Sequence, residues 1–292
     1  MPYIQVENNS NKKVFYVDKG QGKEVIFFIH GWHQNARDCF GSFIDLFQHS
    51  CRVIAPDLPG HGSSFKDQNQ SYNLDDSYLA LNGILKNISS KNIQISIVAY
   101  GAGCYFAVKA AIKNPDIIRN IVLISPEVDL QKFYSQHKKV FLSPKILAPF
   151  LLRFRALRGL FPYDDRTFVY HETKGHRIPG KWNYFQIKSR NHPFFAARQF
   201  FKSFSKSRLL NLLPTQSKPA LLCYGEFEKQ EILEEVNYLA DTMPAARRVK
   251  VVGAGRYPHL QASTQVQKQI QEFLEEHRKK GVNWRRFFNW KK

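Results

Sequence analysis

Short apolar runs alternate along the chain with stretches in which apolar side chains recur every three or four positions. The continuous run 24–29 (EVIFFI) is typical of a strand buried on both faces, whereas residues 37–48 carry apolar side chains at helical spacing. Further strands are predicted at 52–55, 95–100, 118–124, 220–224 and 248–252, and further helices at 74–88, 102–113, 231–241 and 264–277. Residues 3–7 and 14–18 alternate loosely and predict an opening antiparallel hairpin. The alternation of strands and helices predicts an α/β protein with a mostly parallel central sheet and helices on both faces.

This rhythm stops after residue 130 and resumes near residue 211. The intervening stretch contains closely mixed aromatic and basic residues and no convincing strand. We therefore divide the chain into an α/β core (1–130 and 211–278), a helical basic and aromatic cap (131–210) and a basic aromatic tail (279–292).

Positive charge is concentrated in two of these parts. The chain carries a formal net charge of +19, but the cap holds 17 basic and 3 acidic residues, and the last 16 residues hold 7 basic residues and no acidic one. The tail also places Trp284, Phe287 and Phe288 at helical spacing, which suits a helix lying at an anionic membrane surface. The alternative is that the aromatic side chains of the cap and tail pack on the core and their charges are solvated. Anionic lipids, or an acidic protein, are the partners that this charge indicates. Nucleic acid is disfavoured because no nucleic-acid motif accompanies the charge.

The cysteine pattern and the absence of long apolar runs predict where in the cell the protein lies. The four cysteines are far apart and lie in predicted core elements, without a C-x-x-C pair, so we expect buried free thiols. No secretory pattern follows Met1, and no apolar run reaches the ~20 residues of a spanning helix. These features predict a cytoplasmic protein, peripheral to the inner face of a membrane if the basic regions bind lipid. We expect no metal and no cofactor, and the sequence leaves the oligomeric state open.

A turn of small residues follows the predicted strand at 95–100 and opens the next helix. Its sequence is Ala99-Tyr100-Gly101-Ala102-Gly103. A nucleophile elbow has the pattern G-x-S-x-G, with the nucleophilic serine at the tip of a strand-to-helix turn. The frame of that pattern is present here, but the tip is Gly101, which has no side chain to attack a substrate.

Four motifs in order along the chain resemble those of the α/β-hydrolase superfamily. They are the strand ending in His30-Gly31-Trp32, the loop 57–64 (DLPGHGSS), the turn at Gly101, and the closing pair 224–228 (YGEFE) and 253–260 (GAGRYPHL). The resemblance covers about residues 14–130 and 211–277. It implies an α/β-hydrolase fold with an inserted helical cap, in which His30 and His61 have structural roles.

The resemblance also implies where a catalytic triad would lie. The nucleophile position is Gly101, the base position is Arg256, and the acid position is Glu228, with Glu226 as the alternative. Arginine stays protonated and cannot accept a proton from a nucleophile. Since losing a triad member lowers the rate by about 10⁴–10⁶, the triad is predicted to be degenerate. We hypothesise that Arg256 forms an ion pair with Glu228; the alternative is that Arg256 points into solvent.

Three other residues are candidates to substitute for the missing groups. Cys104 follows the turn and is more simply interpreted as a buried structural cysteine. His259 lies near the lost base position, where a surface or loop-packing role is the simpler interpretation. His33 lies at the mouth of the loop after the first buried strand.

Ligand binding does not require the lost side chains. The family's oxyanion donors are backbone N–H groups, and the matching donors here are those of Ala102 and Trp32, with Gly31 and Tyr100 beside them. The leading hypothesis is a pseudo-hydrolase that binds a small apolar or acyl-type ligand at an anionic membrane surface. One alternative is an active esterase, thioesterase or lyase-type hydrolase using non-classical residues. The other is an interaction scaffold for an acidic partner.

Overall fold

The computed structural model describes residues 3–5, 12–32, 34–90, 93–141 and 193–278, and the fold is given for these ranges. Most of the predicted cap (142–192), the tail (279–292) and His33 lie outside the described residues. The division into core, cap and tail therefore stays a prediction.

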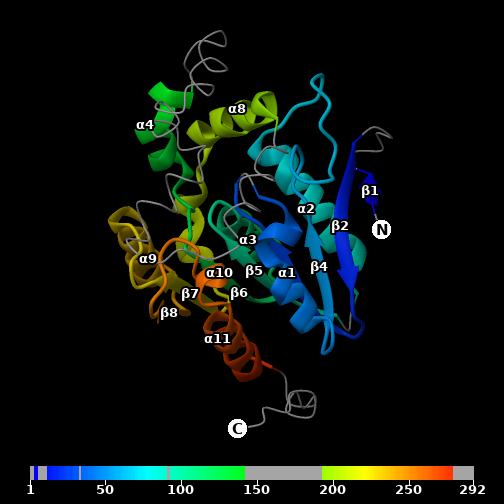
Figure 1. Cartoon of the computed structure of the whole chain (residues 1–292), viewed down its shortest axis with the longest axis vertical. Helices are drawn as coiled ribbons and strands as arrows, with labels where there is room; N and C mark the ends of the chain where they lie inside the picture. Colours follow the sequence, from blue (N-terminus) through cyan, green and yellow to red (C-terminus); the bar gives the residue numbers. More distant parts are fainter. Residues whose placement is uncertain (1–2, 6–11, 33, 91–92, 142–192, 279–292) are drawn as a thin grey trace.

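The described strands form one twisted sheet at the centre of the molecule (Figure 1). They are β1 (Tyr3–Gln5), β2 (Lys13–Lys19), β3 (Glu24–Ile29), β4 (Arg52–Pro56), β5 (Gln94–Tyr100), β6 (Ile118–Ile124), β7 (Ala220–Gly225) and β8 (Ala246–Val251). Their order is β1-β2-β4-β3-β5-β6-β7-β8. The first two neighbouring pairs are antiparallel and the others are parallel, which confirms the predicted hairpin and sheet.

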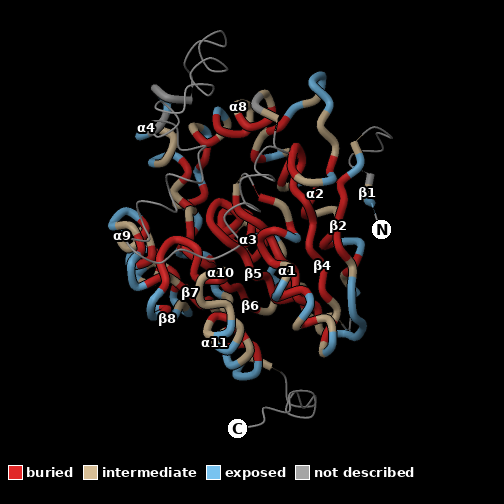
Figure 2. Tube along the Cα trace, in the orientation of Figure 1, coloured by how far each residue is buried: buried red, intermediate tan, exposed pale blue. Residues whose placement is uncertain are grey.

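Helices cover both faces of this sheet. They are α1 (Ala36–Phe47), α2 (Leu74–Ile88), α3 (Gly103–Lys113), α4 (Leu130–Phe141), α8 (Phe194–Ser203), α9 (Gln230–Thr242), α10 (Pro258–Gln261) and α11 (Ser263–Glu276), with 3₁₀ turns η3 (Phe204–Lys206) and η4 (Leu209–Thr215). Apolar side chains of α1 and α11 pack on one face, and those of α2, α3 and α9 pack on the other. The buried residues accordingly follow the central strands and the inner sides of the helices (Figure 2). Among the described residues, no helix combines the length and apolarity needed to cross a bilayer.

Helix α8, in the last part of the predicted cap, forms hydrogen bonds with the beginning of α2. Gln199 accepts a hydrogen bond from the backbone N–H of Tyr72 (3.1 Å), and Ser203 accepts one from that of Leu74 (3.1 Å). The side chain of Asn73 accepts from the Asp76 N–H at 2.8 Å and caps the same helix. Because the first N–H groups of a helix have no partner within it, these contacts satisfy donors that would otherwise need water.

A carboxyl group on α9 fixes the loop between β6 and α4. Glu235 accepts hydrogen bonds from the backbone N–H groups of Val128 and Asp129, the second at 3.0 Å. Burial raises the pKa of the Glu235 carboxyl to about 8, above an ordinary value of 4.5. The loop that Glu235 holds includes Glu127, which takes part in the site described below.

This pKa shift predicts how stability depends on pH. Between about pH 4.5 and pH 8 the folded chain holds a proton on Glu235 that the unfolded chain has released. The unfolding free energy therefore falls as pH rises through this window, by at most about 1.4 kcal/mol per pH unit, and the fall ends above the folded pKa. The variant Glu235→Gln keeps an oxygen acceptor and should lose this component in urea unfolding measured from pH 5 to 9. Glu234→Gln, on the exposed side of α9, is the matched control; parallel profiles for wild type and Glu235→Gln would contradict the assignment.

Candidate active site

The turn between β5 and α3 holds Gly101 in a conformation that favours glycine. Its φ is +54°. Its N–H donates to the carbonyl oxygen of Ile124 at 3.0 Å, and its own carbonyl accepts from the N–H groups of Cys104 (3.0 Å) and Glu127 (3.1 Å). These bonds join the tip of the turn to the end of β6, at the edge of the sheet where the parallel strands end.

The tip of this turn is open enough for a small side chain. A Cβ atom added to Gly101 would lie 3.4 Å from Glu127 Oε2, 3.7 Å from Arg256 Nη2 and 3.9 Å from the Cα of Gly31. These are ordinary van der Waals distances. The predicted nucleophile position therefore lacks a side chain because its residue is glycine, and not because neighbouring atoms crowd it.

Arg256 lies beside the tip as a buried cation. Its side chain is only 7 % exposed, and Nη2 forms an ion pair with Glu127 Oε1 at 2.6 Å. Nη1 donates a hydrogen bond to the carbonyl oxygen of Ser125 at 3.0 Å and lies 3.8 Å from Glu228 Oε1. The guanidinium therefore connects the loops that follow β6, β7 and β8.

The charges around Arg256 keep it protonated. Burial by itself favours the neutral form of the guanidinium, but the negative charges of Glu127 and Glu228 outweigh burial and raise the pKa of Arg256 above its usual range. Burial, followed by repulsion from Arg256, lowers the pKa of the nearby Lys229 to about 8. The predicted base position thus holds a group that does not accept a proton at any working pH.

Glu127 and Ser125 are site residues that the sequence analysis missed. Ser125 has a φ of +42°, an uncommon value for a residue with a side chain that costs on the order of 1–3 kcal/mol. In this conformation its N–H donates to the Cys223 carbonyl at 2.8 Å, while its own carbonyl faces Arg256. The available signal was position: Glu127 is the first charged residue after β6, and the ends of adjacent parallel strands meet at one edge of a sheet.

The two candidates for the acid position have different surroundings. Glu228 has a fully buried side chain, and its Oε1 accepts from the Lys229 N–H at 3.2 Å. Its Oε2 accepts no hydrogen bond from the residues that the structure describes. Glu226 instead accepts from the N–H of Gly253 at 2.9 Å in an exposed setting. The geometry places Glu228, and not Glu226, next to the guanidinium, at a distance that agrees with the hypothesised pair.

Of the two expected oxyanion donors, Ala102 is the better defined. Its N–H lies at the start of α3, and no residue in the described ranges accepts a hydrogen bond from it. Trp32 is stacked on Phe201, with ring centroids 5.8 Å apart and an angle of 8° between the planes. The rings of Phe204 and Phe133 also pack on Trp32, at 5.4 Å and 5.9 Å. The loop after β3 is therefore joined to α4 and α8 by aromatic contacts.

Gly31 and Tyr100 belong to the frame of the turn. A Cβ atom on Gly31 would lie 2.8 Å from the ring of Tyr100, so only glycine allows this approach. The Tyr100 ring packs against that of His259 at a centroid distance of 4.3 Å, and its hydroxyl donates to the Arg256 carbonyl at 3.3 Å. Tyr100 is 4 % exposed, so its side chain supports the loop that carries Arg256 and does not line an open surface.

The candidate substitute nucleophile and base are both buried in the core. Cys104 lies beneath the turn, where its thiol contacts the Ala99 carbonyl at 3.4 Å and burial raises its pKa well above the usual range. A thiol with a raised pKa is a poor nucleophile. His259 is completely buried, with Nε2 3.6 Å from the sulfur of Cys39. His259 is therefore a core residue and not the surface residue that was one of its expected roles.

His30 and His61 lie within the loops that frame the site. His30 Nε2 accepts a hydrogen bond from the Leu58 N–H at 2.9 Å, and burial lowers the pKa of the ring. His61 contacts the Pro59 carbonyl through Nδ1 at 3.0 Å. All four cysteines are buried and carry no disulfide. Within the described ranges, no group of three or more His, Cys, Asp or Glu side chains is arranged to hold a metal ion.

Comparison with known proteins gives a family and several partial relatives, of which two are described. A family model described as the alpha/beta hydrolase fold matches residues 24–263. The probable lysophospholipase BODYGUARD 2 of Arabidopsis thaliana is 31% identical over 115 residues, which cover 37% of this chain and 24% of that protein. An uncharacterized hydrolase of Saccharomyces cerevisiae is 30% identical over 120 residues, covering 41% of this chain and 40% of that protein. The matches thus span about a quarter and two fifths of these relatives.

Solved structures show the same fold. The epoxide hydrolase CorEH superposes with a TM-score of 0.74 at 14% identity, covering 95% of this chain and 99% of that chain. A thermophilic esterase from Thermogutta terrifontis superposes with a TM-score of 0.68 at 18% identity, covering 96% and 100%. Identities this low establish likeness of fold and nothing about substrate. The family match over residues 24–263, the sheet order and the glycine-tipped turn agree, and the chain belongs to the α/β-hydrolase fold family.

Proposed function

We propose that this protein binds an apolar or acyl-type ligand at the turn of Gly101 without hydrolysing it. The observation that carries the proposal is the replacement of both proton-transfer partners. The tip of the turn has no side chain, and the base position holds Arg256, kept protonated by Glu127 at 2.6 Å. Ester hydrolysis on this fold needs a nucleophile and a base that accepts its proton.

The groups that remain favour an oxygen that carries negative charge. The N–H of Ala102 lies at the first turn of α3, where the helix dipole favours an anion or a polarised carbonyl oxygen. Arg256 lies at the same edge of the sheet, but Glu127 and Glu228 balance its charge, so the Ala102 N–H is the group that remains for a polarised oxygen. The buried rings of Phe200, Phe201 and Phe204 pack around Trp32 and make the surroundings of this loop apolar. An acyl group, with a polar head and an apolar chain, has the chemistry that this arrangement suits.

An anionic membrane surface is the proposed setting. The support for it is the net charge of +19 and its concentration in residues 131–210 and 277–292. One partial relative is named as a probable lysophospholipase, which is consistent with a lipid-derived acyl ligand here.

A specific observation favours a second function, hydrolysis that uses Glu127. Its side chain is 22% exposed, and a carboxylate oxygen lies 3.4 Å from the position of a Cβ on Gly101. A carboxylate in that place could attack an acyl carbon or activate water. The ion pair with Arg256 opposes both roles because it holds the carboxylate against the guanidinium.

The two functions differ in their response to substitution. We expect wild-type protein to show no turnover of 4-nitrophenyl butyrate above a buffer blank. The double variant Gly101→Ser with Arg256→His should restore a nucleophile and a base, and should exceed either single variant by about tenfold or more. Gly101→Ala is the control for backbone strain at the positive φ. Wild-type turnover that Glu127→Gln abolishes would overturn the binding proposal in favour of the second function.

Charge at the tip of the turn should control binding of an anionic ligand. Asp and Asn have similar size and both tolerate a positive φ. The variant Gly101→Asp should bind laurate about tenfold or more weakly than Gly101→Asn, a difference of about 1.4 kcal/mol in binding free energy. The neutral methyl ester of the same chain should distinguish the variants much less. Titration calorimetry measures both ligands, and equal laurate affinities for the two variants would place the carboxylate elsewhere.

A further inference from the structure

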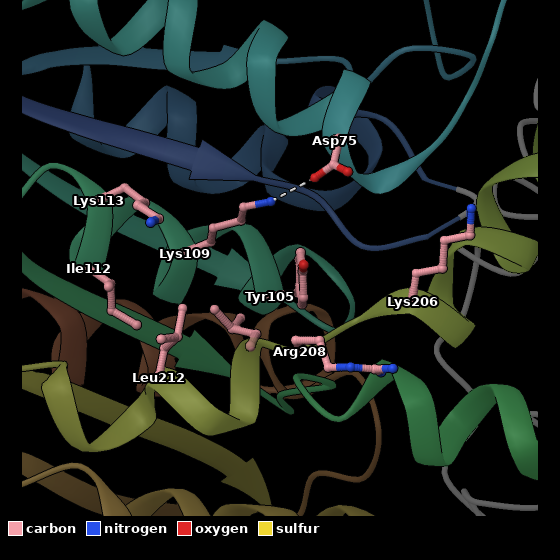
Figure 3. A pocket seen from close by; sticks show the side chains of 9 residues that line it. Asp75, Tyr105, Lys109, Ile112, Lys113, Lys206, Arg208 and Leu212 are labelled. Carbon is pink, nitrogen blue, oxygen red and sulfur yellow. Dashed lines mark hydrogen bonds and ion pairs between the residues drawn. The ribbon is translucent and has the colours of Figure 1, made fainter.

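A groove rich in basic side chains runs along the flank of α3 (Figure 3). Its volume is about 220 Å³. Lys109 and Lys113 of α3 line one side. Lys206 and Arg208, near the end of the predicted cap, line the other. Asp75, at the beginning of α2, is the one acidic residue among those that line it.

The sequence places the α3 side of this groove by helical spacing. Tyr105, Lys109 and Lys113 follow one another at intervals of four residues, so they share one face of the helix. At about 1.5 Å per residue this row extends roughly 12 Å along the helix axis. Lys109 Nζ lies 4.6 Å from the ring centroid of Tyr78 and 5.8 Å from that of Tyr105, which holds its ammonium group over aromatic faces.

The charges around the groove are unbalanced. Asp75 pairs with Lys109 at 3.0 Å, but the Asp75 side chain is 83% exposed and provides one negative charge against four positive charges. Lys113, Lys206 and Arg208 are exposed at the rim. This surplus of positive charge around the groove attracts a multiply charged anion.

We propose that this groove is a binding site for a phosphate group, carried by a phosphomonoester or by an anionic phospholipid. A phosphomonoester carries a charge of about −1.5 to −2, so a groove with a surplus of positive charge attracts it more strongly than it attracts a single carboxylate. The groove follows the flank of α3 and uses none of the residues at the Gly101 turn. The proposal therefore stands independently of the ligand proposed for that turn.

The test uses the full chain and two phosphate probes. Glycerol 1-phosphate is titrated by calorimetry at low ionic strength, and vesicles of phosphatidylcholine with and without phosphatidic acid are used in sedimentation. The variant Lys206→Gln with Arg208→Gln should weaken binding by about tenfold or more. Lys19→Gln with Lys23→Gln removes the same charge from exposed residues outside the groove, the predicted cap and the tail, and should change binding by less than about twofold. Asp75→Asn, which removes the competing carboxylate, should tighten binding.

Each outcome bears on the proposal. Groove-dependent binding of glycerol 1-phosphate supports it with a soluble ligand. Groove-dependent sedimentation with phosphatidic acid, without binding of glycerol 1-phosphate, supports it with a lipid as the source of the phosphate. Equal losses in the groove and control variants, weaker binding by Asp75→Asn, or no binding of either probe would overturn it. Circular dichroism melting of each variant excludes unfolding as the cause of a loss.

Discussion

A single buried cation holds together the edge of the sheet where the site lies. Arg256 reaches Glu127 after β6, the carbonyl of Ser125 in the same loop, and Glu228 after β7. Removing one partner of a buried ion pair typically costs about 3–5 kcal/mol, because the charge left behind has lost both water and its counter-ion. The positions of three loops therefore depend on the guanidinium remaining charged and in place.

The same contacts decide what chemistry this edge can perform. A histidine in the base position would exchange a proton with a nucleophile, whereas a guanidinium between two carboxylates stays protonated. At the predicted nucleophile position, Gly101 has a positive φ and open space around it, but it has no side chain that could act as a nucleophile. Glu235 contributes to this arrangement because it accepts hydrogen bonds from the loop after β6, which contains Glu127. The helix N-terminus and the Ala102 N–H remain, and these are the groups that the proposed ligand would contact.

Most of the strands and helices could be predicted from residue patterns, whereas the contacts between the side chains of the site could not. The runs at 24–29, 74–88 and 118–124 coincide with β3, α2 and β6, because continuous apolar runs and helical spacing are local signals. The pairing of Arg256 with Glu228 was one of two alternatives that the motif positions left open, and the 3.8 Å between the two side chains agrees with it. Glu127 was missed because its partner is 129 residues away in sequence and it belongs to no motif. The short helix α10 and the burial of His259 also depend on tertiary packing, against Tyr100 and Phe40, that no local pattern records.

We propose that this edge of the sheet holds an acyl group and leaves it intact. A crystal structure of the protein grown with a long-chain acyl thioester tests this most directly. The account predicts an unbroken thioester, with its carbonyl oxygen within hydrogen-bonding distance of the Ala102 N–H and Arg256 still paired with Glu127. An acyl group covalently attached to Glu127, or separated products in the site, would contradict it.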